Sequence, residues 1–174
     1  MKFQIEQAVE ILSNTPIVLR SLLGNLSNEW IEKVVDSEDW NPFDIVGHYI
    51  HGEETDWIPR AELILKQGAN ITFEPFDRFA QFESSKGKTL RELLETFAEL
   101  RQESLATLQS WDLTDEQLKL KGIHPELGEV NLGQLLSTWV VHDLTHIRQI
   151  VSVLAKKYTE NVGVWKEYLS ILQK

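Results

Sequence analysis

The chain has 174 residues, enough for one domain with a full hydrophobic core, and we expect residues 1–174 to form a single domain. It carries 17 Lys and Arg against 27 Asp and Glu, a net charge of −10. That charge argues against a nucleic-acid partner, because binding to phosphates requires basic surfaces. The absence of cysteine excludes a disulfide framework, a thiolate zinc site and a cysteine nucleophile. We see no signal peptide and no membrane-spanning run, so we expect a cytoplasmic protein without a membrane partner.

Four segments have the apolar spacing of amphipathic helices, and short polar stretches with Gly or Pro separate them. These segments, followed by a shorter closing helix, are expected over residues 3–26, 41–67, 89–108, 131–158 and 164–172. Asn41 is a predicted N-cap, and Thr89 with Glu92 has the spacing of a capping box. Pro16 and Pro59 lie inside the first two segments and are expected to bend them.

The lengths of these segments favour a helical bundle. Helices of 20 to 28 residues span about 30 to 42 Å, which suits four-helix packing. We therefore predict an all-α fold, an up-and-down-type four-helix bundle with a short extra C-terminal helix and little or no sheet. Residues 71–73 form the only β-like run that we recognise. The link over residues 68–88 carries four phenylalanines and is expected to pack across the bundle. With six tryptophans as well, the apolar surface exceeds what one bundle needs and favours a homodimer.

Two histidines in the fourth segment have the spacing of metal ligands. His142 and His146 are four residues apart, so both imidazoles lie on one side of a helix and can reach one ion. At about 100° per residue both fall within about 60° of Trp139, on the apolar stripe. The simpler interpretation is a pair of core-edge histidines satisfied by Asp or Glu. Because each buried imidazole then needs its own partner, metal binding is an equally good explanation.

The third ligand must come from another helix, and the second segment offers His48 and His51. Helical phase does not choose between them, because this segment is apolar on more than one face. Gly52 follows one turn after His48 and leaves room for a ligand or an approaching helix, which makes it a pocket candidate.

Three short motifs together resemble the DinB-like superfamily of metal-binding four-helix bundles, which includes the bacillithiol and mycothiol transferases. Each motif is loose by itself, but they occur in the family's order and span most of the chain. The first is TPIVLR at 15–20, the second is WNPFDIVGH at 40–48, and the third is GEVNL at 128–132 followed by HDLTHIRQ at 142–149.

The resemblance implies a triad of His48, His142 and His146 on one divalent ion, zinc or nickel, with open positions for water or substrate. We predict that these three imidazoles converge to within about 3 to 4 Å and that His51 lies outside the first shell of ligands. The resemblance also makes His124 a pocket candidate, and Gln149 of the last motif is another.

Three neutral imidazoles leave the ion its full charge, so that it acidifies a water or a thiol. We therefore predict a metal-dependent enzyme of the thiol S-transferase or hydrolase type, acting on a small-molecule substrate. A thiol nucleophile has to arrive with the substrate, and the resemblance suggests a low-molecular-weight thiol such as bacillithiol. Asp143, Glu53 and Glu54 are candidates to orient an imidazole from behind. For Glu53 we favour the alternative of a solvated carboxylate on the helix face.

Two other functions compete with this one. The first is a non-catalytic bundle that keeps a structural or sensing metal centre, for which a fourth protein ligand such as His124 would argue. The second is a zincin-type peptidase, because HDLTH at 142–146 differs from H-E-x-x-H by one methylene. Asp143 is short for the general base of such an enzyme.

Overall fold

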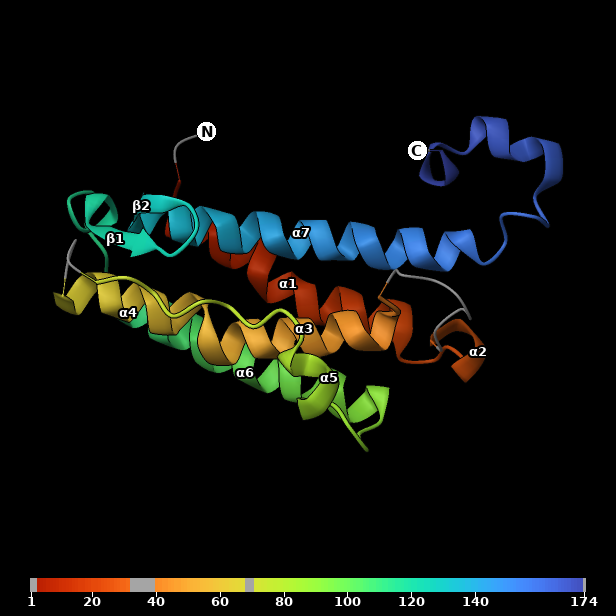
Figure 1. The fold of residues 1–174 in the computed structure, drawn as a ribbon, viewed down its shortest axis with the longest axis horizontal. Coiled ribbons are helices and arrows are strands. Elements are labelled where there is room, and N and C mark those ends of the chain that lie inside the picture. Colours follow the sequence, from red (N-terminus) through yellow and green to blue (C-terminus); the bar gives the residue numbers. More distant parts are fainter. Residues whose placement is uncertain (1–2, 32–39, 68–70, 174) are drawn as a thin grey trace.

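A computed structural model describes residues 3–31, 40–67 and 71–173 of the chain. Four long helical segments pack side by side, as Figure 1 shows, which confirms the predicted all-α four-helix bundle. The helices of these segments are α1 Ile5–Leu23, α3 Pro42–Thr55 with α4 Trp57–Gln67, α6 Leu90–Ser110 and α7 Leu132–Lys156. The short elements are α2 Asn28–Ile31, α5 Ala80–Ser84, the 3-10 turns η2 Gln117–Lys119, η3 Gly163–Tyr168 and η4 Ser170–Leu172, and the strands β1 Lys121–His124 and β2 Gly128–Asn131.

Capping boxes fix where three of the long helices begin. The side chain of Asn41 accepts the Asp44 amide at the start of α3, and Thr89 does the same for Glu92 at α6. Asn131 forms the third box, at the start of α7. In each box the side chain three residues on accepts the amide of the cap residue in return, so two unsatisfied donors of the first turn are paired. The starts predicted at Asn41 and Thr89 are confirmed.

The second segment is interrupted rather than smoothly bent. Pro59 has no amide hydrogen to donate to the carbonyl of Thr55, and its ring crowds that carbonyl. α3 ends before Asp56, whose φ of −111° departs from the regular helical value, and α4 begins at Trp57. In α1, by contrast, Pro16 is accommodated within one continuous helix.

The four segments do not alternate in direction, which corrects the up-and-down arrangement expected from the sequence. One apolar cluster joins the first halves of α1 and α7 to α4 and to the end of α6. A second cluster joins the later halves of α1 and α7 to α3 and to the start of α6. The order is therefore up–down–down–up, with α1 parallel to α7 and α3 parallel to α6 (Figure 1). The main helix contacts run from α1 to α6 and α7 and from α3 to α6 and α7, so α1 and α3 lie on a diagonal.

The link between α4 and α6 makes this reversal possible by returning along the bundle. Its described part begins at Ile71, and Phe73 is buried, as the expected packing across the bundle requires. Phe79 and Phe82 stay 59% and 39% exposed, but α5 still packs against α3, where Gln81 and Ser85 are buried. Gly68, where the link was expected to start, lies outside the described residues.

A small sheet that the sequence analysis did not predict lies beside the start of α7. β1 and β2 form an antiparallel hairpin in which Gly122 pairs with Val130. The run predicted to be β-like does join it, because Thr72 forms a parallel bridge to Ile123. The amide of Phe73 donates to the carbonyl of Ile123 over 2.9 Å.

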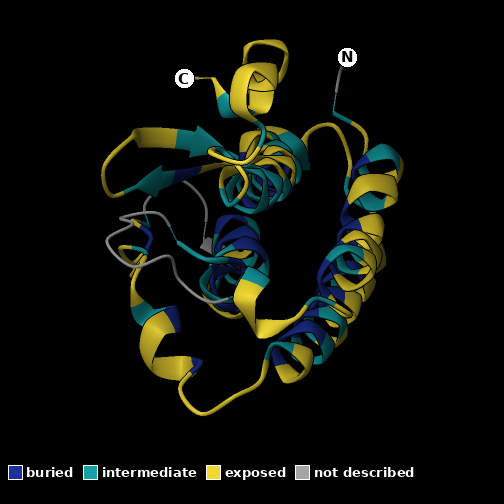
Figure 2. Ribbon diagram, turned by 90° about the vertical axis from the view of Figure 1, so that its right-hand side faces the viewer, coloured by how far each residue is buried: buried dark blue, intermediate teal, exposed yellow. Residues whose placement is uncertain are grey.

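The chain closes in two short 3-10 turns rather than in a regular helix. η3 and η4 occupy the expected position, and their side chains are largely exposed (Figure 2). Among the described residues no helix combines the length and the low polarity that crossing a membrane requires.

Candidate metal centre

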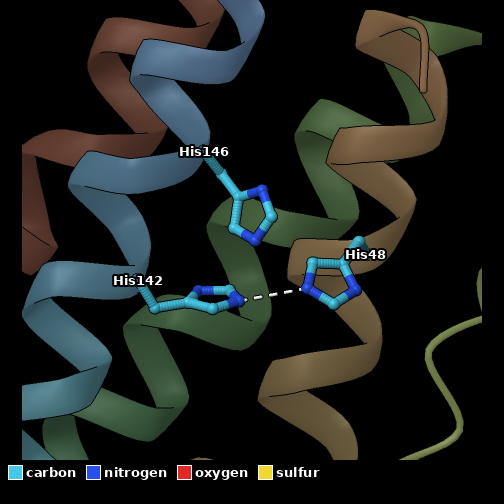
Figure 3. Close-up of side chains that lie close together, drawn as sticks. All are labelled: His48, His142 and His146. Carbon is cyan, nitrogen blue, oxygen red and sulfur yellow. Dashed lines mark hydrogen bonds between the residues drawn. The ribbon is translucent and has the colours of Figure 1, made fainter. Parts of the chain in front are cut away.

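Three histidines from two antiparallel helices point at one another inside the bundle. Figure 3 shows His48 on α3 facing His142 and His146, which lie one turn apart on α7. The Nε2 atoms of His48 and His142 are 3.1 Å apart. One nitrogen of each of the three rings lies within 4.8 Å of the others. This spacing is looser than the 3 to 4 Å that we predicted for bound ligands.

Hydrogen bonds orient these rings. The Nδ1 atom of His146 is 2.7 Å from Oε1 of Gln149, one turn further along α7. Because an amide oxygen only accepts, His146 carries its proton on Nδ1 and presents the lone pair of Nε2 to the other two histidines. Between His48 and His142, one Nε2 donates to the other at 3.1 Å. A cation held between them needs both lone pairs, so that proton has to move to an Nδ1 atom.

The surroundings keep the imidazoles of His48 and His146 neutral. Burial, with the nearby charges of His142 and His146, lowers the pKa of His48 to about 3. Burial and the neighbouring His142 lower the pKa of His146 to about 4. A neutral imidazole offers a lone pair at pH 7, whereas an imidazolium offers none. His48 and His146 therefore each offer a lone pair to a cation near neutral pH.

Aromatic rings enclose the cluster. The ring centroids of Trp40 and Phe76 lie 5.1 and 5.4 Å from that of His48. The ring of Trp57 meets His142 edge-on at 5.0 Å. These side chains keep His48 buried, but 19% of the His142 side chain remains exposed. The cluster is thus shielded from bulk water while one ligand keeps contact with solvent.

Tyr49 ties the two ligand-bearing helices together next to the cluster. Its hydroxyl donates to the backbone carbonyl of Asp143 over 2.7 Å, which joins α3 to α7. Burial and the charge of Asp143 raise its pKa, so the phenol stays protonated. Tyr49 therefore serves here as a hydrogen-bond donor and not as a source of negative charge.

A buried ion network lies behind the histidines. Arg101 of α6 donates to Asp143 over 2.5 and 3.0 Å and to Glu53 over 2.8 and 3.0 Å. The side chains of all three are at most 1% exposed. The favoured interpretation of Glu53 as a solvated carboxylate is therefore wrong. Burial raises the pKa of Glu53. Burial alone would raise that of Asp143 too, but the neighbouring His142 and Arg101 lower it.

Sequence reasoning missed Arg101 altogether, although a signal was present. The residue lies four positions from both Phe97 and Leu105, in phase with the apolar stripe of α6. A guanidinium at such a position needs buried carboxylates, and α3 and α7 supply one each.

Comparison with known proteins settles the family. The family model described as the DinB superfamily matches residues 11–150, which is most of the chain. This protein belongs to the DinB superfamily. YfiT from Bacillus subtilis, described as a probable metal-dependent hydrolase with an unusual four-helix bundle topology, has a similar structure. The TM-score is 0.77 at 23% identity, over 90% of this chain and 89% of that chain, so the likeness is one of fold. No curated protein matches.

In this DinB bundle the pocket candidates lie at different distances from the triad. Gln149 contacts it directly through His146. His124 ends β1, and its Nδ1 accepts the amides of Glu126 and Leu127, so it stabilises the hairpin turn and is not part of the cluster.

The room expected beside Gly52 is filled by an indole, since a Cβ there would lie 3.2 Å from Nε1 of Trp57. His51 packs against Phe76 at 4.8 Å and stays outside the cluster.

The residues of this DinB site fit a divalent transition metal. Imidazole nitrogens suit zinc and nickel, and the three rings come from two rigid helices. No other set of three His, Asp or Glu side chains in the described residues converges in this way. Asp143 was expected to orient a ligand imidazole through a hydrogen bond. Its Oδ1 atom lies 4.0 Å from Nδ1 of His142, which is longer than a hydrogen bond.

Proposed function

We propose that the protein is a metal-dependent enzyme in which His48, His142 and His146 hold one zinc or nickel ion. The observation that carries the proposal is the convergence of three nitrogen ligands, one buried and two partly buried, without a fourth. Structural zinc sites are closed by four protein ligands, whereas catalytic sites keep a position open. In the part of the chain that the structure describes, no further His, Asp or Glu joins the cluster, which favours catalysis over a structural centre.

The reaction we propose is hydrolysis, or transfer of a low-molecular-weight thiol such as bacillithiol, on a small-molecule substrate. When bound, the ion supplies the positive charge that lowers the pKa of a water or a thiol. Gln149 fixes the tautomer of His146, and the aromatic rings around His48 exclude bulk water. The hydrolase side of the proposal is supported by the fold shared with YfiT, a probable metal-dependent hydrolase.

The arrangement of Asp143 disfavours the peptidase alternative. Both of its carboxylate oxygens accept hydrogen bonds from Arg101, and the side chain is fully buried. A carboxylate held in this way does not reach a water in front of the histidines, as the general base of a zincin must.

The test is metal binding by the purified protein, measured by elemental analysis and by titration with zinc and nickel. We expect one ion per chain. His142→Ala or His146→Ala should abolish retention, and so should His48→Ala. His51→Ala, on the same helix but outside the cluster, should leave it nearly unchanged. Equal loss in all four variants would refute this choice of ligands.

The metal-loaded protein then separates the two reactions. Turnover of activated esters or amides without added thiol indicates a hydrolase, whereas turnover of an electrophile that depends on bacillithiol indicates a transferase. A metal-loaded protein that does neither supports the sensing or structural alternative.

A further inference from the structure

One guanidinium contacts all four long helices at the level of the histidine cluster. Arg101 extends from α6, its Nε and Nη2 donate to Glu53 of α3, and its Nη1 and Nη2 donate to Asp143 of α7. Nη1 also donates to the carbonyl of Leu12 in α1 over 2.9 Å. The three neighbouring helices therefore hold one planar, rigid fork of donors.

The acceptor on α1 exists because of a proline. In a regular helix the carbonyl of Leu12 accepts the amide of residue 16, but Pro16 has none. That carbonyl faces the core, where Arg101 donates to it. A group that would otherwise be buried without a partner is thus used to fix the guanidinium.

Two aromatic faces restrict the same group from the sides. The guanidinium carbon lies 4.8 Å from the ring centroid of Phe97 and 5.2 Å from that of Trp139. The indole of Trp139 also donates to Oε1 of Glu53 over 3.2 Å. With both its edges and its faces engaged, Arg101 has little freedom to shift.

The carboxylates that it binds lie on the same two helices as the ligand histidines. Glu53 follows His48 by five residues on α3, and Asp143 directly follows His142 on α7. A shift of α3 against α7 that separates His48 from His142 would therefore also stretch the hydrogen bonds to Arg101. We infer that Arg101 is a positioning residue that sets the separation of the ligand nitrogens. This inference rests on the proposed metal site.

Charge and geometry predict opposite effects of removing this residue. Arg101, Glu53 and Asp143 together carry one positive and two negative charges. If charge alone mattered, Arg101→Gln would leave two carboxylates near the site and tighten cation binding. If geometry matters, Arg101→Gln and the charge-conserving Arg101→Lys both weaken binding, because neither keeps the fork.

The experiment compares zinc affinities, measured by competition with a chromophoric chelator, and melting temperatures of the metal-free proteins. We expect both Arg101 variants to bind zinc about 10- to 100-fold more weakly than the wild type. Leu108→Ala is the matched control, since it empties a buried position two turns further along α6. It should lower the melting temperature without moving the zinc affinity more than twofold. If Arg101→Lys fails to fold, Arg101→Gln decides by itself, because charge alone predicts tighter binding and geometry predicts about tenfold weaker binding.

Several results would overturn the inference. Zinc affinity within twofold of wild type in Arg101→Lys would do so, as would tighter binding in Arg101→Gln. An equal loss in Leu108→Ala would show that the affinity only follows stability. If the wild type binds neither zinc nor nickel, the proposed function fails, and crystal structures of the metal-free proteins decide about Arg101. The Nε2 atoms of His48 and His142, 3.1 Å apart, should then separate beyond hydrogen-bond distance in Arg101→Lys. An unchanged distance would refute the positioning role.

Discussion

Acidification should destabilise the metal-free protein through its buried histidines. The folded protein holds the pKa of His48 at about 3, against 6.5 for an exposed imidazole. Below pH 6.5 the unfolded chain binds a proton at this position and the folded chain does not, so the free energy of unfolding falls as the pH drops from 6.5 towards 3. Between pH 7 and pH 5, one such histidine lowers the free energy of unfolding by about 2 kcal/mol. His146, with a pKa of about 4, contributes a similar amount with the same sign.

Two carboxyl groups work in the opposite direction. Burial raises the pKa of Glu53 and of Asp56, so these groups take up protons in the folded state first and offset part of the loss. The informative quantity is therefore a difference between proteins. Urea unfolding in EDTA, followed by tryptophan fluorescence, gives the stability at pH 7 and at pH 5. The loss between these two pH values should be about 2 kcal/mol smaller in His48→Gln than in the wild type.

Leu108→Ala is the control, because it lowers stability without removing a titratable group. It should show the same loss between pH 7 and pH 5 as the wild type. Equal losses in the wild type and in His48→Gln would show that His48 is not held neutral by folding, and would refute the reasoning.

Two further predictions concern the rest of the molecule. A Cβ at Gly122 would approach side-chain atoms of Phe73 and Ile64 to 2.8 and 2.9 Å, and both residues are buried. Gly122→Ala should therefore lower the free energy of unfolding, measured by urea titration, by about 1 to 3 kcal/mol. A loss below about 0.5 kcal/mol would contradict this packing. The homodimer stays a prediction, and the side chains of Trp165 and Tyr168, 69% and 83% exposed, are its candidate contacts. Trp165→Glu should then convert dimers to monomers in sedimentation velocity, and a wild type that is monomeric at micromolar concentration would rule the dimer out.

The parts of the fold that were predicted correctly depend on interactions between residues only a few positions apart in the sequence. Asn41 and Thr89 begin helices because the cap and its partner are three residues apart, so the whole interaction is visible in a short window. The placement of His142 and His146 together follows from helical periodicity alone. His48 needed the resemblance to a family, because phase on a helix with apolar residues on several faces does not select one side.

The rest depends on contacts between distant residues. Glu53 was taken for a solvated carboxylate because its partner, Arg101, lies 48 residues further along the chain. The hairpin of β1 and β2 was missed because strands of four residues, with three of their eight residues exposed and one buried, carry little alternation. The predicted direction of α6 was wrong, because the length of the link between α4 and α6 does not show whether the chain returns along the bundle or turns at its end.

The position of α6 in the bundle explains why charged side chains are buried in the core. α6 makes its main contacts with α1 and α3 and lies diagonally across the core from α7, so only a long side chain from α6 reaches α7. Arg101 does so between Phe97, which belongs to one apolar cluster, and Leu105, which belongs to the other. The core is therefore two apolar halves separated by a polar layer. The histidine cluster lies beside this polar layer. Hydrogen bonds in the layer have defined lengths and directions, whereas apolar packing is adaptable, so the hydrogen bonds set the distance between α3 and α7.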